Sequence, residues 1–77
     1  MKYLIIPEGC RWTETEAQTP EGAYTGVCCW YNPETRIAVI NTATSEAAIF
    51  TRQLDKAGNL VSVNRVPLHS WAGDNSN

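Results

Sequence analysis

The predicted fold depends most on residues 23–41, which read AYTGVCCWYNPETRIAVIN. Residues 23–31 are apolar on both alternating faces, a pattern typical of a central β-strand. Residues 32–35, Asn-Pro-Glu-Thr, place Asn first and Pro second, which favours a type I turn. Residues 36–41 then return as the antiparallel partner, with Trp30 opposite Ile37 and Tyr31 paired with Arg36 at the exposed end of the hairpin. This segment predicts a β-hairpin at the centre of an antiparallel sheet.

The segments before this hairpin predict two further strands. Residues 3–6, Tyr-Leu-Ile-Ile, are aromatic or aliphatic and are followed by Pro-Glu-Gly, which indicates a short strand closed by a turn. Residues 11–22 are mostly polar and predict an exposed loop. Within that loop, the alternation of Thr and Glu over residues 11–16 favours an edge strand.

The segment that follows, residues 44–66, supports two interpretations. In the first, residues 49–55 and 59–66 form a β-hairpin, because Ile, Phe and Thr at positions 49–51 suit a strand. The turn between them is a type I turn closed by a left-handed glycine at Gly58. This turn places Leu54 opposite Leu60, whereas hydrophobic alternation favours Val61 opposite Leu54.

In the second interpretation, Thr44 or Ser45 caps a helix over about residues 45–57. Ala47, Phe50 and Leu54 share one face of this helix, and Gly58 ends it. Ile49 then falls on the polar side, and for this reason we favour the hairpin.

These elements predict a mainly β fold, a small antiparallel sheet or partly open barrel of four or five strands. The helical alternative gives an α+β fold, with one helix at about 45–57 packed on three or four antiparallel strands. Residues 1–71 are expected to form a single globular domain. Residues 72–77 offer little to bury and predict a frayed C-terminal tail.

Charge and hydropathy disfavour several classes of partner. The formal net charge is −2, and the six basic residues do not cluster, whereas binding to duplex DNA needs many positive charges on one surface. No apolar run approaches the roughly 18 residues of a membrane span, and the apolar start is too short for a signal-peptide core. We therefore expect a cytoplasmic protein without a membrane partner, and nucleic acid is disfavoured.

Three cysteines, Cys10, Cys28 and Cys29, and the single histidine His69 are the candidates for chemistry. An odd cysteine count without a secretory signal argues for reduced thiols. These four residues match the ligand count of a Cys3His zinc site, but the spacing lacks a C-x2-C pair. Of the adjacent Cys28 and Cys29, at most one should enter the core. We expect no metal, no cofactor and no catalytic residue, and hence no enzyme.

The aromatic content points instead to recognition. Seven aromatic residues among 77 exceed what so small a core hides completely, and interfaces are enriched in Trp, Tyr and Arg. Trp12, beside Arg11 and an acidic loop, is the aromatic residue we most expect to be exposed. The predicted binding surface comprises Arg11, Trp12, Glu14, Glu16, Tyr31, Arg36 and Trp71.

The predicted function is therefore that of a small non-catalytic binding protein that acts on a larger protein partner. Its size and style are those of phage or mobile-element inhibitors and accessory factors, such as inhibitors of a host defence system. Five glutamates against two basic residues over positions 1–34 favour a basic partner. Unpaired strand edges favour a homodimer.

The alternative function is small-ligand binding. In that case an aromatic-lined pocket or dimer interface holds a nucleotide-like molecule, and Arg36, Arg52 or Arg65 binds the charged group of that molecule.

Overall fold

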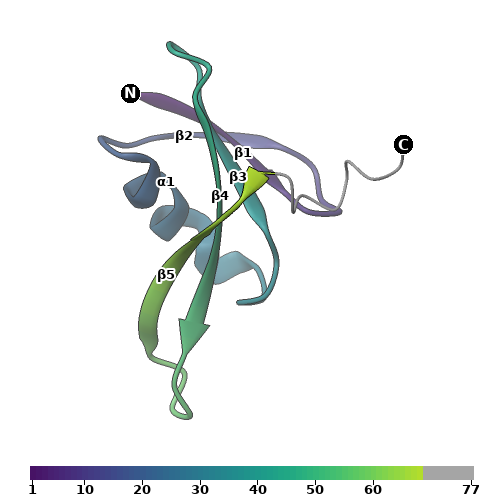
Figure 1. Cartoon of the computed structure of the whole chain (residues 1–77), viewed down its shortest axis with the longest axis vertical. Helices are drawn as coiled ribbons and strands as arrows, with labels where there is room; N and C mark the ends of the chain where they lie inside the picture. Colours follow the sequence, from purple (N-terminus) through teal and green to yellow (C-terminus); the bar gives the residue numbers. More distant parts are fainter. Residues whose placement is uncertain (69–77) are drawn as a thin grey trace.

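The computed structural model describes residues 1–68, which form one antiparallel sheet with a short helix on one face (Figure 1). Its strands are β1 (Lys2–Pro7), β2 (Thr13–Glu16), β3 (Ile37–Asn41), β4 (Ala47–Leu54) and β5 (Leu60–Val66), and its helices are α1 (Pro20–Val27) and the short 3-10 helix η1 (Cys28–Trp30). The five strands follow the order β2-β1-β3-β4-β5. The sheet is open, with β2 and β5 at its edges.

This architecture confirms the predicted small, mainly β fold with an antiparallel sheet of five strands. The strands expected at residues 3–6 and 11–16 are β1 and β2. The alternative helix at about 45–57 is not formed, because these residues make β4 and the turn after it. The predicted domain boundary after residue 71 and the tail at 72–77 lie outside the described residues.

The prediction of a central strand at residues 23–31 is wrong, because this segment forms α1 and η1. Helix α1 begins with Thr19, whose side-chain oxygen accepts a hydrogen bond from the Gly22 amide at 3.0 Å, and with Pro20 in the first turn. Tyr24, Val27 and the following Cys28 then lie on one buried face, as helical spacing requires.

Strand β3 therefore has different partners from the expected hairpin partner. It pairs with β1 on one side and β4 on the other, so that Ile37 lies opposite Pro7 and Phe50. The turn predicted at residues 32–35 does form, and the Thr35 amide donates to the Asn32 carbonyl at 3.0 Å. It leads from η1 into β3 instead of joining two paired strands.

The hairpin predicted at residues 49–66 is confirmed as β4 and β5. The Asp55 amide donates to the Asn59 carbonyl at 2.9 Å, and Gly58 has a φ of 89°, which is the left-handed glycine of the predicted turn. Leu54 lies opposite Leu60, and the register shifts by one residue between Gln53 and Leu54. The resulting β-bulge lies at the hairpin end of β5.

The hydrophobic core lies between α1 and the face of the sheet that α1 covers. Tyr24 packs on Phe50 of β4 with ring centroids 5.4 Å apart, and both side chains are almost fully buried. Each such aromatic side chain contributes about 1.5–3 kcal/mol when fully buried. The remaining members of the core are Tyr3, Ile5, Ala23, Val27, Cys28, Ile37, Val39 and Ala48.

Substitution of Gly26 tests the helical conformation of this segment. Gly26 is exposed in α1, and an added Cβ would meet no atom within 4 Å. Because alanine is the better helix former, Gly26→Ala is expected to raise the free energy of unfolding by about 0.5–1 kcal/mol, measured by urea denaturation.

The matched control is Gly22→Ala, whose added Cβ would lie 3.1 Å from the capping Thr19 Oγ1. This variant should gain less than Gly26→Ala or lose stability. A lower stability of Gly26→Ala than of the wild type would contradict the helix.

Candidate functional site

Two exposed tryptophan side chains lie in segments at the end of the sheet where β1 ends and β3 begins. We name this surface the tryptophan end and define it as residues 10–12, in the β1–β2 turn, and residues 29–31, in and after η1. The side chains of Trp12 and Trp30 are 63% and 71% exposed. These two are the largest side chains that the described residues leave in solvent.

Contacts between the ends of two strands bring these segments to one end of the molecule. The Glu8 amide, directly after β1, donates to the Arg36 carbonyl, directly before β3, at 2.8 Å. The Arg36 guanidinium also lies 3.4 Å from the Glu8 carboxylate. Trp12 follows Glu8 by four residues, and Trp30 precedes the loop that leads to Arg36.

Arg52 of β4 fixes the η1 part of the tryptophan end. Its side chain is half-buried and donates hydrogen bonds to the Cys28 carbonyl and, at 2.9 Å, to the Tyr31 carbonyl. The Arg52 amide donates to the Pro33 carbonyl at 3.2 Å. Because one guanidinium binds the carbonyls on both sides of Trp30, the backbone of η1 is held while the indole remains exposed.

The structure places four of the predicted site residues at the tryptophan end or next to it. Arg11 and Trp12 are exposed, whereas Tyr31 and Arg36 are half-buried. The expected pairing of Tyr31 with Arg36 across a hairpin is absent because that hairpin does not form, and Arg36 pairs with Glu8 instead. Trp71 lies outside the described residues.

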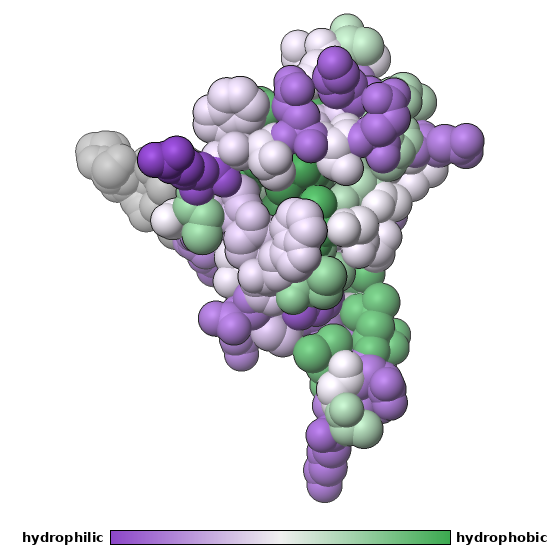
Figure 2. Space-filling model, turned by 180° about the vertical axis from the view of Figure 1, so that it is seen from behind, coloured by the Kyte–Doolittle hydropathy of each residue, from purple (hydrophilic) through white to green (hydrophobic). Residues whose placement is uncertain are grey.

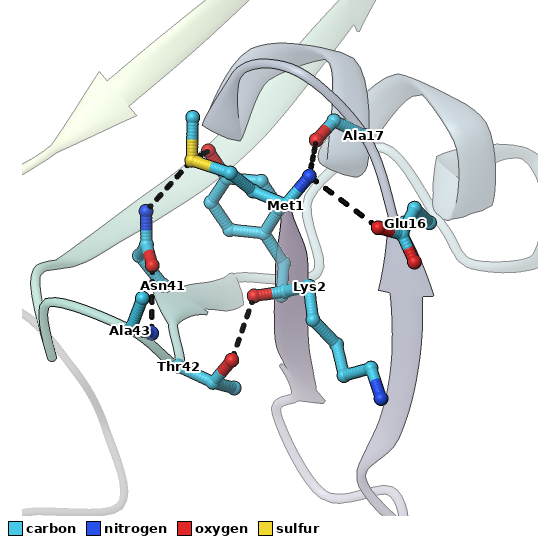
Figure 3. Close-up of polar contacts among 8 residues, drawn as sticks. Met1, Lys2, Glu16, Ala17, Asn41, Thr42 and Ala43 are labelled. Carbon is cyan, nitrogen blue, oxygen red and sulfur yellow. Dashed lines mark hydrogen bonds and ion pairs between the residues drawn. The ribbon is translucent and has the colours of Figure 1, made fainter.

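The other two predicted site residues, Glu14 and Glu16, lie on β2 and point away from the α1 face. Their register partners are Leu4 and Lys2, which also lie on the face opposite α1. The Glu16 carboxylate is 3.4 Å from the Met1 amine, which also donates to the Ala17 carbonyl at 2.9 Å (Figure 3). These glutamates form an acidic edge that is separate from the tryptophan end.

Trp30 is not among the site residues predicted from the sequence. In the predicted hairpin its indole lay in the core opposite Ile37, but η1 turns it into solvent. The capping sequence Thr19-Pro20-Glu21 was the signal that favoured a helix and hence a different position for Trp30.

Of the cysteines, Cys28 is buried, while Cys10 and Cys29 are exposed. The expectation that at most one of the two adjacent cysteines enters the core is therefore confirmed. Among residues 1–68, no three His, Cys, Asp or Glu side chains come together as potential metal ligands. His69 lies outside the described residues.

A hollow of about 490 Å³ lies beside the start of α1. Tyr3 is the only aromatic residue that lines it among residues 1–68, and Arg65, which also lines it, lies 3.2 Å from Glu21. Asn41 uses its Oδ1 to accept from the Ala43 and Thr44 amides and its Nδ2 to contact Met1 Sδ (Figure 3). The other residues that line the hollow are Met1, Gln18, Thr19, Pro20, Val39, Glu46, Ala47 and Ala48.

Comparisons with known proteins identify no relative of this chain. No family model, curated protein or solved structure matches it. Over residues 1–68, no helix has the length and apolar character needed to cross a membrane.

The buried hydroxyl of Tyr24 gives a pH-dependent test of the hydrophobic core between α1 and the sheet. The Tyr24 hydroxyl has no hydrogen-bond partner within residues 1–68, and burial raises the pKa of the phenol above its ordinary value of 10.0. The nearby Arg52 guanidinium opposes this shift, but burial has the larger effect. Above about pH 10 the unfolded chain loses this proton first, so stability falls as the pH rises further.

Tyr24→Phe removes the unpaired hydroxyl, whose burial disfavours folding by about 1–3 kcal/mol. We expect this variant to melt at or above the wild-type temperature at pH 7, and to lose less stability between pH 9 and 11. Thermal melts followed by circular dichroism measure both effects. Equal pH slopes for the two proteins, or a clear loss of stability at pH 7, would show that the hydroxyl has a stabilising partner.

Proposed function

We propose that this chain is a small non-catalytic binding protein that acts by occupying a surface of a larger protein. The observation that carries this proposal is the exposure of Trp12 and Trp30 at one end of the molecule, at 63% and 71%. A tryptophan buries about 150–250 Å² when it is covered, and tryptophan is among the residues most enriched at binding hot spots.

The backbone around these side chains favours binding because it is held before a partner arrives. Arg52 binds the carbonyls on both sides of Trp30, and Arg36 pairs with Glu8 between the two tryptophan-bearing segments. An interface that is already ordered loses less conformational entropy on association. The partner would meet the Trp30 indole on a backbone that Arg52 holds, with Arg11 and Trp12 exposed in the turn that follows Glu8.

The acidic edge formed by Glu14 and Glu16 supports a partner with a basic surface near its Trp-binding pockets. Both glutamates are exposed, and complementary charge raises association rates and selects partners. In this proposal the chain serves as an inhibitor or accessory factor of that protein. We also propose that it forms a homodimer, because an open sheet leaves strand edges that a second copy can pair.

Small-ligand binding in the hollow beside α1 is the second candidate function. Its volume of about 490 Å³ lies within the usual range for ligand sites, and Arg65, which lines it, supplies a cation. The Asn41 side chain and the Arg65 guanidinium are already bonded within the chain, which disfavours this function. Binding of a nucleotide to the purified protein, measured by calorimetry and weakened by Arg65→Ala, would support it.

Alanine substitution of both tryptophans tests the protein-binding proposal. Partners captured from the source cells by the tagged wild-type protein are identified by mass spectrometry, and the affinity of the purified partner is measured by calorimetry. We expect Trp12→Ala and Trp30→Ala each to weaken binding at least about tenfold, with melting temperatures near that of the wild type.

The matched control is Leu68→Ala, which truncates another apolar side chain of similar exposure, 55%, outside the tryptophan end. This variant should bind as the wild type does. Wild-type affinity in both tryptophan variants would refute the assignment of the site. A drop of many degrees in melting temperature would place these indoles in the core.

A further inference from the structure

The two edges of the sheet differ in length and composition. β2 spans four residues, Thr13–Glu16, whereas β5 spans seven, Leu60–Val66. Within residues 1–68 no strand pairs with the outer side of β5. An antiparallel edge strand directs about half of its backbone hydrogen-bonding groups outward, where another strand can bind them.

β2 is protected against pairing with itself. Glu14 and Glu16 alternate along its four residues, and both side chains are exposed. Antiparallel pairing of two β2 strands would bring these carboxylates close to those of the second copy, and like charges that face each other destabilise a pair. Charged residues on a short strand are a common protection of sheet edges.

β5 lacks this protection. Its only charged residue is Arg65, whose guanidinium lies 3.2 Å from the Glu21 carboxylate of α1 and stacks 5.3 Å from the Phe50 ring centroid. This charge is therefore engaged on the α1 face of its own chain. The remaining residues of β5 are aliphatic or small and neutral, and the only charge of β5 is therefore one that already pairs with a carboxylate of its own chain.

Exposed apolar side chains accompany this edge. Leu60 and Val61 are 51% and 59% exposed, and Figure 2 shows apolar surface gathered over the β4–β5 hairpin, at the lower right of the view. Pairing along β5 would bring a second strand next to these side chains and remove part of their apolar surface from water. The same edge thus offers backbone groups and apolar surface together.

We propose that β5 pairs antiparallel with β5 of a second copy, which joins two five-stranded sheets into one continuous sheet. This proposal names the surface of the homodimer inferred above, and it uses residues outside the tryptophan end. A two-fold axis makes the contact self-complementary and closed, so assembly stops at the dimer. The occupant of the β5 edge is therefore another copy of this chain.

Several antiparallel registers keep outward-facing residues of one copy opposite those of the other, and two of them centre on the middle of β5. These two place Val63 or Asn64 on the two-fold axis. In the first, Arg65 lies opposite Val61 and Ser62 opposite Asn64; in the second, Arg65 lies opposite Val63. Neither register opposes two like charges.

The expected dimer is weak and depends on concentration. A pairing of at most seven residues per strand falls at the small end of specific interfaces, which bind in the weaker range. The dimer should therefore be measured by sedimentation velocity over a series of protein concentrations, including the highest that the protein's solubility allows.

Charges placed on the β5 edge test the pairing directly. In both registers Ser62 and Asn64 of one copy lie opposite or diagonal to those of the other, on the face away from α1. Ser62→Lys combined with Asn64→Lys should give a monomer, and so should Ser62→Glu combined with Asn64→Glu. Mixing the two variants should restore a one-to-one heterodimer, because opposite charges then face each other.

The control is Asn32→Lys combined with Ala43→Lys, which adds the same charge at exposed loop positions and should dimerise as the wild type does. Wild-type dimerisation of the like-charged β5 variants, or a monomer at every wild-type concentration, would overturn the proposal. Open-ended assembly into larger species would also overturn it, because β5 would then pair with β2 of the next copy.

If a charged variant does not fold, amide hydrogen exchange of the wild type still tests the pairing of β5. Protection of β5 amides should rise with protein concentration, while protection of β2 amides should not. Unchanged β5 protection would refute the pairing. If the charged β5 variants fold and retain the affinity for a larger partner, the β5 contact and the tryptophan end are separate surfaces, and failure of one leaves the other standing.

Discussion

The packing of α1 on the sheet is the interaction on which the rest of this structure depends. Tyr24 and Phe50 meet at a ring-centroid distance of 5.4 Å, and both side chains are almost fully buried. Without the apolar face of α1, the Tyr3, Ile5 and Ile37 side chains on the same face of the sheet would lie in water. A chain of 77 residues has one core only, so the position of α1 determines which side chains are buried.

The candidate surfaces consist of side chains and strand edges that this core does not bury. α1 lies over the centre of the sheet, and the chain then turns through η1, which directs Trp30 outward while Arg52 holds the backbone. The strand edges also lie beyond α1, and they differ because β2 is acidic and β5 is nearly uncharged. The tryptophan end and the β5 edge are therefore two surfaces with different chemistry, suited to different partners.

Much of the sheet could be predicted from the sequence because its signals are local. The Asp-Lys-Ala-Gly turn and the β-branched residues around it specify the β4–β5 hairpin, and the Tyr-Leu-Ile-Ile run specifies β1. Residues 23–31 were misassigned because an apolar run satisfies both a period of 2 and a helical period. The Thr19 cap and Pro20 resolve that ambiguity, and they did not enter the prediction.

The same ambiguity explains which part of the candidate site could be predicted. Trp12 lies in a polar segment that predicts either an exposed loop or an edge strand, so its exposure follows from its neighbours in sequence. The exposure of Trp30 depends on whether its segment is a strand or a helix. The Thr19 cap and Pro20 favour the helix locally, and the packing of Tyr24, Val27 and Cys28 in the core stabilises it.

The most direct test of this account is acrylamide quenching of Trp30 fluorescence in a chain that carries Trp12→Phe and Trp71→Phe. The helical arrangement predicts efficient quenching, close to that of the unfolded chain, because the indole is 71% exposed. Strong protection of Trp30 in the folded protein would contradict the account, since it would place the indole in the core and remove both α1 and the tryptophan end.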